Sequence, residues 1–197
     1  MSSLLRRARD LAAACLLLGA AAGCRDTYEY KGVVMEPPEA APPLKLPRAD
    51  GPPFDLAQER GNVVLLFFGY THCPDVCPTT LADWAKVKQG LGADTSRVRF
   101  VFVSVDPERD TPEIAADYAR QYDKGFIGLS GSPGEIDLVK RAFRVQAEKE
   151  ETGSASEYTV GHTSLSYLVD PEGKIRLMYS FGARPDDITA DVQHVLD

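Results

Sequence analysis

Two cysteines separated by three residues are the side chains with the most chemistry in this sequence. Cys73 and Cys77 lie in the segment Gly69-Tyr70-Thr71-His72-Cys73-Pro74-Asp75-Val76-Cys77-Pro78. In the first turn of a helix, residues i and i+4 share a face with Cα atoms about 6 Å apart, within reach of a disulfide or of one shared metal ion. Thiolates are soft ligands that suit Cu(I) or Zn(II). The pair therefore predicts metal binding or thiol exchange, and an inert structural disulfide is the plainer alternative.

A third ligand for such a metal could come from a histidine far along the chain. His162 lies in Val160-Gly161-His162-Thr163-Ser164, directly before an expected hairpin strand. In a thioredoxin-like fold this region faces the dithiol, and the cis-proline that thioredoxins carry there is replaced by Gly161-His162. His162 would then complete a Cys2His set, which fits trigonal Cu(I), or Cu(II) with an added ligand, whereas structural zinc takes four ligands. A histidine with a purely structural role is the plainer alternative.

The two other histidines are expected to be bystanders. His72 adjoins Cys73, but a neighbour in the chain has strained access to the same ion. His194 falls in the last expected helix. The sequence therefore assigns the metal site to Cys73, Cys77 and His162.

Alternating strands and helices must position these residues. Continuous apolar runs at 62–70 and 98–105 predict two parallel central strands that are covered on both faces. Between them, Leu81 and Trp84 lie on one apolar stripe at helical spacing, which predicts a crossover helix over 78–91. The cysteine pair then stands at the junction of a strand and a helix, where the amides of the helix N-terminus favour thiolate over thiol.

The rest of the chain continues this alternation. Thr111-Pro112-Glu113 predicts a helix start, and Asp170-Pro171-Glu172-Gly173 predicts the turn of a hairpin. The remaining expected elements are a short strand at 126–129, a helix from Pro133, an exposed loop at 148–157, hairpin strands at 164–170 and 174–181, and a helix at 185–196. This order predicts an α/β protein with a thioredoxin-like three-layer fold, in which helices flank a central mixed sheet.

The first residues have the pattern of an export signal. Three arginines within the first ten residues precede an apolar run at 11–23, which at 13 residues is shorter than the roughly 20 that span a membrane. An uncleaved anchor that also uses Leu4 and Leu5 is the alternative.

A cysteine closes this segment. Ala21-Ala22-Gly23-Cys24 resembles the bacterial lipobox, whose cysteine is lipidated and becomes the first residue of the mature protein. The alternative is that Cys24 is one more small residue near a cleavage site. We therefore expect a lipoprotein-type signal peptide at 1–23, a flexible, proline-containing tether at 24–43 and the folded domain at 44–197.

Composition narrows the function classes. The 197 residues are 44% hydrophobic and 26% charged, which is typical of one globular domain. With 22 Lys+Arg against 29 Asp+Glu, the formal net charge of −7 lacks the basic excess of a nucleic-acid-binding protein. Four cysteines are too few for a disulfide scaffold, and Cys15 would leave with the signal peptide. Cys73 and Cys77 then remain as the usable thiols of an exported domain.

Three segments in order resemble the SCO/SenC family. They are 69–78, Val103-Ser104-Val105-Asp106-Pro107-Glu108-Arg109-Asp110-Thr111-Pro112, and 160–164, and the likeness covers most of 44–197. The resemblance implies a membrane-tethered copper-binding protein with a thioredoxin-like fold that serves assembly of the dinuclear copper site of cytochrome c oxidase subunit II. Many family members have a transmembrane anchor, so the apparent lipobox departs from them.

The resemblance also implies roles for single residues. Cys73 and Cys77 match the thiolate ligands and redox pair of the family, and His162 matches the imidazole ligand. Asp106 matches an acidic residue of the second segment that lies near the site, and a turn residue before Pro107 is the alternative.

We expect the protein to be a metallochaperone, and an enzyme is the less favoured alternative. A site of two thiolates and one imidazole is open to an incoming ligand, and a periplasmic copper donor could load it. The alternatives are a thiol-disulfide reductase that acts on the cysteines of the same target, which would not need His162, and a redox or copper sensor. The expected location is the periplasmic side of the bacterial inner membrane, with an N-terminal lipid or anchor in the membrane.

Overall fold

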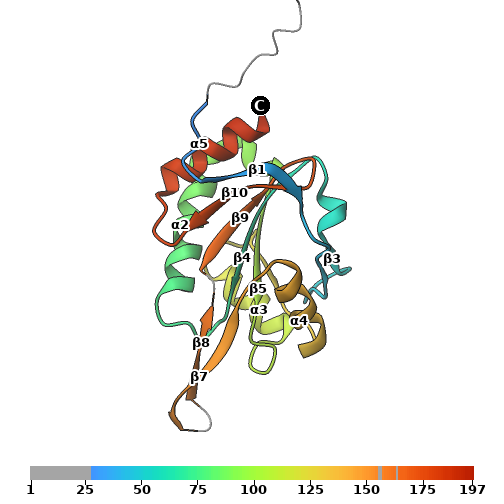
Figure 1. Ribbon diagram of the computed structural model, residues 1–197, viewed down its shortest axis with the longest axis vertical. Coiled ribbons are helices and arrows are strands. Elements are labelled where there is room, and N and C mark those ends of the chain that lie inside the picture. Colours follow the sequence, from blue (N-terminus) through green and yellow to red (C-terminus); the bar gives the residue numbers. More distant parts are fainter. Residues whose placement is uncertain (1–27, 155–156, 163) are drawn as a thin grey trace, which may run out of the picture.

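A six-stranded mixed sheet forms the centre of the protein. The computed structural model describes residues 28–154, 157–162 and 164–197, and the side chains of 151–158 and 162 lie outside the described part (Figure 1). The strand order is β1-β10-β9-β4-β5-β6. Their bounds are Val33–Ala40 for β1, Val63–Gly69 for β4, Val98–Ser104 for β5, Ile127–Leu129 for β6, Leu165–Val169 for β9 and Lys174–Ser180 for β10. Strands β4, β5 and β6 run parallel, and β9, β10 and β1 add antiparallel pairs.

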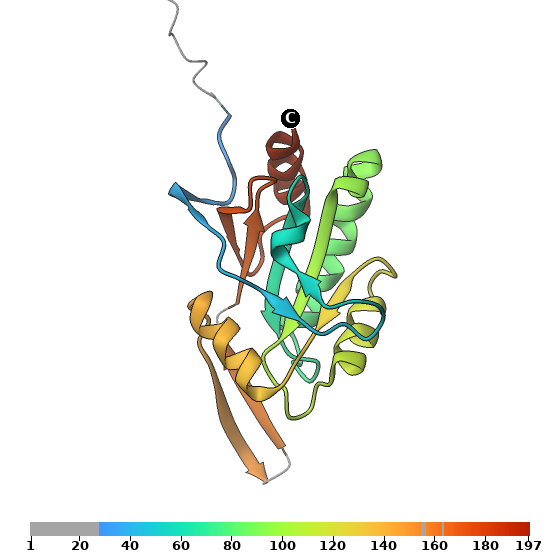
Figure 2. The same cartoon turned by 90° about the vertical axis from the view of Figure 1, so that its right-hand side faces the viewer.

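Helices cover both faces of this sheet (Figure 2). Because successive side chains of a strand point to opposite faces, Phe67 of β4 meets Trp84 while Phe68 meets Phe143. Trp84 belongs to α2, and Phe143 directly follows α4. The helices are α2 (Val76–Leu91), α3 (Pro112–Arg120), α4 (Pro133–Ala142) and α5 (Pro185–Leu196), with 3-10 turns η1 (Leu56–Glu59) and η2 (Gly92–Arg97). The predicted layers and their α/β order are therefore confirmed.

Local signals explain where the helices begin. The Thr111 side chain accepts a hydrogen bond from the Ile114 amide, and Pro112 opens α3 as predicted. At α4 the Ser132 hydroxyl and the Glu135 carboxylate cap each other's backbone amides, which is a capping box. Among the described residues, none of the helices has the length and apolar character that crossing a membrane requires.

The structure corrects the predicted tether at 24–43. Residues 33–40 form β1, which pairs with β10, so the folded part begins well before position 44. The pairing register shifts between Val34 and Glu39, around Pro37 and Pro38. Prolines lack the amide that a ladder needs and are tolerated on an edge strand, which is why this strand has the composition of a linker.

A buried carboxylate fastens the chain ahead of β1. Asp191 of α5 is fully buried and accepts hydrogen bonds from the Tyr28 hydroxyl at 2.9 Å and from the Lys31 and Gly32 amides at 3.0 and 2.9 Å. Tyr28 also stacks on His194 with ring centroids 4.0 Å apart. The predicted signal peptide and Cys24 lie outside the described residues.

The predicted loop at 148–157 is also different in the structure. Strands β7 (Ala147–Ser154) and β8 (Glu157–His162) form an antiparallel hairpin that extends from one end of the domain (Figures 1 and 2). Strand formation depends on cross-strand partners more than on the intrinsic preference of the residues. The acidic, Ser/Gly-rich composition of this segment therefore gave no signal of a strand. A second two-stranded pair joins β2 (Lys45–Leu46) to β3 (Phe54–Asp55).

Candidate metal centre

The two cysteines differ in their exposure. Cys73 is half-buried in the loop between β4 and α2, and Cys77 is fully buried in the first turn of α2. Helix α2 begins at Val76, earlier than the predicted residue 78, so Cys73 lies just ahead of it. A partner molecule therefore meets Cys73 first.

Hydrogen bonding and burial separate the two sulfurs further. The Cys77 amide donates to Cys73 Sγ at 3.4 Å, which is the use of a helix N-terminal amide that the sequence predicts. The side-chain hydrogen bond with Cys73 and the burial of Cys77 hold the pKa of the Cys77 thiol well above its ordinary range. Cys77 thus keeps its proton more strongly than an ordinary cysteine.

A glycine makes room for the buried sulfur. A Cβ atom at Gly69 would lie 2.7 Å from Cys77 Sγ and 2.9 Å from both Phe67 and Phe102. Those distances are far inside van der Waals contact, so a side chain at position 69 would displace the sulfur. The last residue of β4 is therefore part of the site.

Tyr70 connects the dithiol loop to the hairpin, although the sequence analysis assigned it no role in the site. Its side chain is buried, and burial is the main reason that its pKa is raised. Its hydroxyl forms a side-chain hydrogen bond with Cys73 and a hydrogen bond with the backbone of Val160 in β8. The Arg109 guanidinium lies 5.8 Å from the centre of the Tyr70 ring.

Strand β8 faces the dithiol loop, as the sequence predicts. A cavity of about 310 Å³ lies between them, lined on one side by Tyr70, Cys73, Pro74, Asp75 and Val76, and on the other by Thr159, Val160, Gly161 and Ser164. The backbone of His162 ends β8 opposite Ala147, and its side chain lies outside the described part. Within the described side chains, three His, Cys, Asp or Glu do not gather around one point, so His162 as a ligand stays a prediction.

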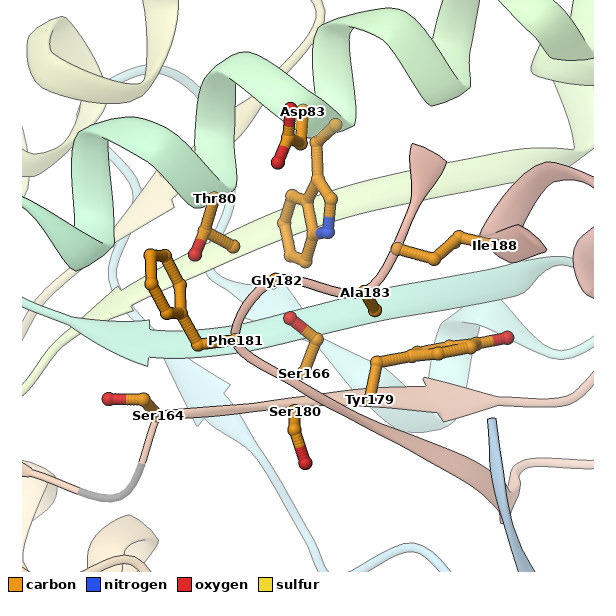
Figure 3. Close-up of a pocket in the computed structure, with 11 residues that line it drawn as sticks. Thr80, Asp83, Ser164, Ser166, Tyr179, Ser180, Phe181, Gly182, Ala183 and Ile188 are labelled. Atoms are coloured by element: carbon orange, nitrogen blue, oxygen red, sulfur yellow. The ribbon is translucent and has the colours of Figure 1, made fainter. Parts of the chain in front are cut away.

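A second hollow adjoins this cavity through Ser164. Thr80 and Trp84 of α2 line it, together with Phe181, whose exposed fraction is 46% (Figure 3). Its volume of about 20 Å³ corresponds to one water molecule. The hollow is too small for a substrate, whereas the larger cavity is lined by Cys73 and is therefore the candidate site.

Asp106 is paired with Arg109. Its buried carboxylate accepts a hydrogen bond from Arg109 Nε, and its backbone carbonyl accepts from the Asp110 amide at 2.9 Å. Because Arg109 lies over Tyr70, Asp106 is connected to Cys73 through two intervening side chains. The position suits the role near the site that the resemblance implies, and that role stays a prediction.

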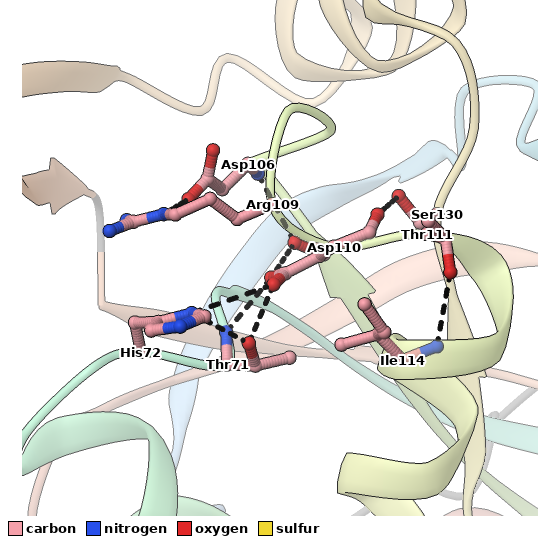
Figure 4. Close-up of polar contacts among 9 residues, drawn as sticks. Thr71, His72, Asp106, Arg109, Asp110, Thr111, Ile114 and Ser130 are labelled. Atoms are coloured by element: carbon pink, nitrogen blue, oxygen red, sulfur yellow. Dashed lines mark hydrogen bonds and ion pairs between the residues drawn. The ribbon is translucent and has the colours of Figure 1, made fainter. Parts of the chain in front are cut away.

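Asp110 is a residue of the site that the sequence analysis did not single out. It is fully buried and accepts hydrogen bonds from the Thr71 amide at 2.9 Å, the Thr71 hydroxyl at 2.5 Å and the Ser104 hydroxyl at 2.5 Å (Figure 4). The available signal was a third acid, after Asp106 and Glu108, in the segment that carries Asp106. Two residues of the β5–α3 loop thus contact the dithiol loop. Arg109 lies over Tyr70, and Asp110 binds Thr71.

The family model and the similar proteins point to the same protein family. The model of the SCO1/SenC family matches residues 34–197. The chain is similar to Protein SCO1 homolog 1, mitochondrial, of Arabidopsis thaliana, with 39% identity over 154 residues, 76% of this chain and 45% of that protein. It is 31% identical to a putative copper-binding protein of Stutzerimonas stutzeri over 199 residues, covering 100% of this chain and 97% of that protein. The chain therefore spans less than half of the plant relative's length.

Solved structures share the fold. Apo Sco1 from Thermus thermophilus superposes with a TM-score of 0.78 at 38% identity, covering 87% of this chain and 99% of that one. ScoI of Bradyrhizobium japonicum with copper bound has a TM-score of 0.73 at 38% identity, covering 79% and 99%. BsSco, described as a member of the Sco family of cytochrome c oxidase assembly proteins, has a TM-score of 0.63 at 28% identity, covering 85% and 97%. The predicted thioredoxin-like fold is confirmed.

Proposed function

Because this chain belongs to the SCO1/SenC family, we propose that it is a membrane-tethered copper metallochaperone for cytochrome c oxidase assembly. Copper is the cargo, Cys73, Cys77 and His162 are its ligands, and subunit II of the oxidase is the acceptor. The observation that carries the proposal is the dithiol itself, with one half-buried and one fully buried cysteine at a cavity that β8 lines on the other side. His162 is the last residue of that strand.

The donor set fits copper. Two soft thiolates and one imidazole suit Cu(I), and three-coordination leaves the ion open to a fourth ligand. A cysteine of the acceptor could bind copper before a ligand of this protein leaves. Copper would then pass by ligand exchange and would stay coordinated throughout. Oxidation of the two thiols to a disulfide, in exchange with an oxidised dithiol that takes the two electrons and two protons, would remove both thiolate ligands. Copper loading would therefore depend on the redox state of the pair.

A tether at Cys24 would be short. Cys24 precedes Tyr28 by four residues, a span of at most about 14 Å. A lipid on Cys24 on the periplasmic side of the inner membrane would therefore keep the α5 end of the domain close to the bilayer. The dithiol loop and the β7–β8 hairpin lie toward the end of the domain opposite α5 (Figure 1). This arrangement would direct the copper site toward other proteins.

Copper stoichiometry tests the proposal. The purified protein is reduced and loaded anaerobically with Cu(I), and separately with Cu(II), beside a His162→Ala variant. We expect one tightly bound copper per chain, with binding lost or weakened in the variant. A reduced protein that binds no copper above background would refute the chaperone function.

The asymmetry of the dithiol also favours a second function, a thiol-disulfide reductase that acts on the cysteines of the same target. The more accessible Cys73 would attack the target disulfide as a thiolate, forming a mixed disulfide and freeing one target thiolate. Cys77 would then attack Cys73 Sγ, which forms the Cys73–Cys77 disulfide and releases the second target thiolate. His162→Ala separates the two functions, because it should abolish tight copper binding and leave the reduction of a protein disulfide intact. Loss of both activities in this variant would contradict the separation.

A further inference from the structure

Two adjacent valines are exposed at the start of the first strand of the sheet. Val33 and Val34 begin β1, and their exposed fractions are 60% and 40%. Successive residues of a strand point to opposite faces, so this end of β1 is uncovered on both faces of the sheet. Strand β1 is also an edge strand of the six-stranded sheet. A surface that met this end of the domain would therefore contact both valines.

The position of these valines is fixed relative to α5. The buried Asp191 carboxylate of α5 accepts hydrogen bonds from the Lys31 and Gly32 amides, directly ahead of β1. Gly32 lies so close to Tyr179 that a Cβ atom at position 32 would be 2.6 Å from the tyrosine ring. If the start of β1 moved away, the buried carboxylate would lose two donors, which is unfavourable. The two valines and α5 thus form one rigid end of the domain.

A hollow with an aromatic and apolar lining opens beside Val34, and its volume is about 460 Å³. Its lining includes the aromatic and apolar side chains of Tyr28, Tyr30, Met35 and Pro38, and charges of both signs at Glu29, Glu36 and Arg176. Tyrosine is favoured at the boundary between lipid and water, because its ring is apolar and its hydroxyl is polar. The charges of opposite sign offset each other, so apolar contact is the main attraction that this surface offers.

The proposed tether indicates what covers this surface. A lipid on Cys24 would lie within about 14 Å of Tyr28, which lines the hollow. We propose that Val33 and Val34, with the hollow beside them, rest on the lipid bilayer that holds Cys24. The proposal rests on the membrane tether of the proposed function and adds a fixed orientation to it. The dithiol loop and the β7–β8 hairpin, at the end opposite α5, would then face away from the bilayer (Figure 1).

The contact with lipid should stay at the level of the headgroups. The outer side of an edge strand presents backbone amides and carbonyls, and hydrocarbon cannot accept or donate hydrogen bonds to them. Pro37 and Pro38 lack amides and reduce this cost only in part. Strand β1 can therefore touch the bilayer surface but cannot enter its hydrocarbon core.

Quenching of tryptophan fluorescence by brominated lipids tests the orientation. The full chain is produced in a bacterial host and purified from its membranes, and the mass of the product shows whether Cys24 carries a lipid. The variants Val33→Trp and Val34→Trp are reconstituted in phosphatidylcholine vesicles, with bromine placed either near the headgroup or at the bilayer centre. Trp84 is the single tryptophan of the wild-type chain and is 1% exposed, so it gives an unquenched background.

Leu138→Trp is the matched control. Leu138 is 66% exposed, but it lies on α4, toward the hairpin end of the domain (Figure 2). Burial of two partly exposed valines should favour the docked orientation by about tenfold, so quenching at positions 33 and 34 should exceed that at 138 by about this factor. Bromine near the headgroup should quench more than bromine at the centre. If an added tryptophan alone drew the domain to the lipid, Leu138→Trp would be quenched equally, which would overturn the proposal.

A charge on the proposed surface and added salt test the nature of the contact. Val34→Asp in the Val33→Trp chain should lower the quenching by about tenfold, because the carboxylate would have to leave water. Circular dichroism checks that this variant is folded. Raising the salt concentration to about 1 M should leave the quenching of Val33→Trp unchanged, since salt screens charges but does not weaken apolar contacts. Loss of quenching at high salt would contradict an apolar docking surface.

The outcomes separate this proposal from the function on which it rests. A purified chain without lipid on Cys24 would refute the tether and the docking together. A lipidated chain in which neither valine position is quenched more than position 138 would overturn the docking alone. If light scattering showed a dimer that shields Val33→Trp from iodide before vesicles are added, a second copy would cover β1, which also overturns the proposal. Copper binding should be equal in all these variants, so its loss would concern the site at Cys73.

Discussion

The carboxylate of Asp110 receives both the backbone amide and the hydroxyl of Thr71, at 2.9 and 2.5 Å, across 39 positions of sequence. Thr71 precedes Cys73 by two residues, so this pair of bonds sets where the dithiol loop leaves β4. Arg109, the neighbour of Asp110, lies over Tyr70, the neighbour of Thr71. Two consecutive residues of the β5–α3 loop therefore hold two consecutive residues of the dithiol loop.

Replacing Asp110 by Asn should change both the stability and the dithiol. Asparagine replaces one of the two accepting carboxylate oxygens by an NH2 group, which only donates. A buried hydroxyl or amide then loses its acceptor, at a cost of about 1–3 kcal/mol. The released loop should also shift the reduction potential of the Cys73–Cys77 pair. Denaturation of the reduced protein measures the first effect, and titration against glutathione measures the second.

Asp191→Asn is the matched control for that variant. Asp191 is as buried as Asp110 and accepts several hydrogen bonds, but from the chain ahead of β1. We expect a similar loss of unfolding free energy and an unchanged reduction potential. Equal shifts of the potential in both variants would show that Asp110 does not position the dithiol.

Gly69→Ala should disturb the buried sulfur. The new Cβ would lie 2.7 Å from Cys77 Sγ, and overpacking of this kind costs about 1–3 kcal/mol. Closure of the Cys73–Cys77 disulfide by a mild oxidant should slow, because the sulfur moves out of position. Gly134→Ala in α4, where a Cβ meets no atom within 4 Å, should be neutral or stabilising. Unaltered closure in Gly69→Ala would contradict the close contact.

Arg109→Met should destabilise the protein through Asp106. The Asp106 side chain is 0% exposed, and removal of its cation leaves a buried charge unpaired, at a cost of about 3–5 kcal/mol. The double variant Asp106→Asn, Arg109→Met should recover much of this loss. Arg120→Met, which breaks pairs with more exposed carboxylates at Asp50 and Asp117, should cost less than about 1 kcal/mol. Urea denaturation of the four proteins decides whether the loss is specific to the buried pair.

The reduced protein should lose stability as the pH rises above about 8.5, the ordinary pKa of a thiol. The pKa of Cys77 is raised in the folded state, so the unfolded chain releases this proton first. Unfolding then releases a proton in this range, and the free energy of unfolding falls by up to about 1.4 kcal/mol per pH unit. Tyrosines with raised pKa values, such as Tyr28 at about 12, add the same trend only at higher pH.

Cys77→Ser provides the comparison for this pH dependence. A serine hydroxyl does not ionise in this range, so the fall between pH 8.5 and 9.5 should shrink in denaturation curves of the variant. A slope identical to that of wild type would mean that Cys77 titrates normally.

Local patterns in the sequence predicted much of the framework. The apolar run of β4 predicted a strand covered on both faces, and Thr111-Pro112 predicted the start of α3. Strand periodicity and helix capping depend on residues within about four positions of each other, and these appear directly in the sequence. The spacing of Cys73 and Cys77 is local in the same sense, which is why the candidate chemistry could be inferred before the fold.

Contacts between distant segments were decided only by the tertiary structure. Strand β1 looks like a linker until β10 supplies its backbone partners, and the acidic hairpin looks like a loop until β7 meets β8. Asp110 looks like a turn residue until folding buries it beneath Thr71. A buried carboxylate must accept hydrogen bonds, and its donors come from segments that only folding brings close. No local sequence pattern specifies which residues those donors belong to. The sequence therefore determined which side chains could bind metal, and the packing decided which residues hold them in place.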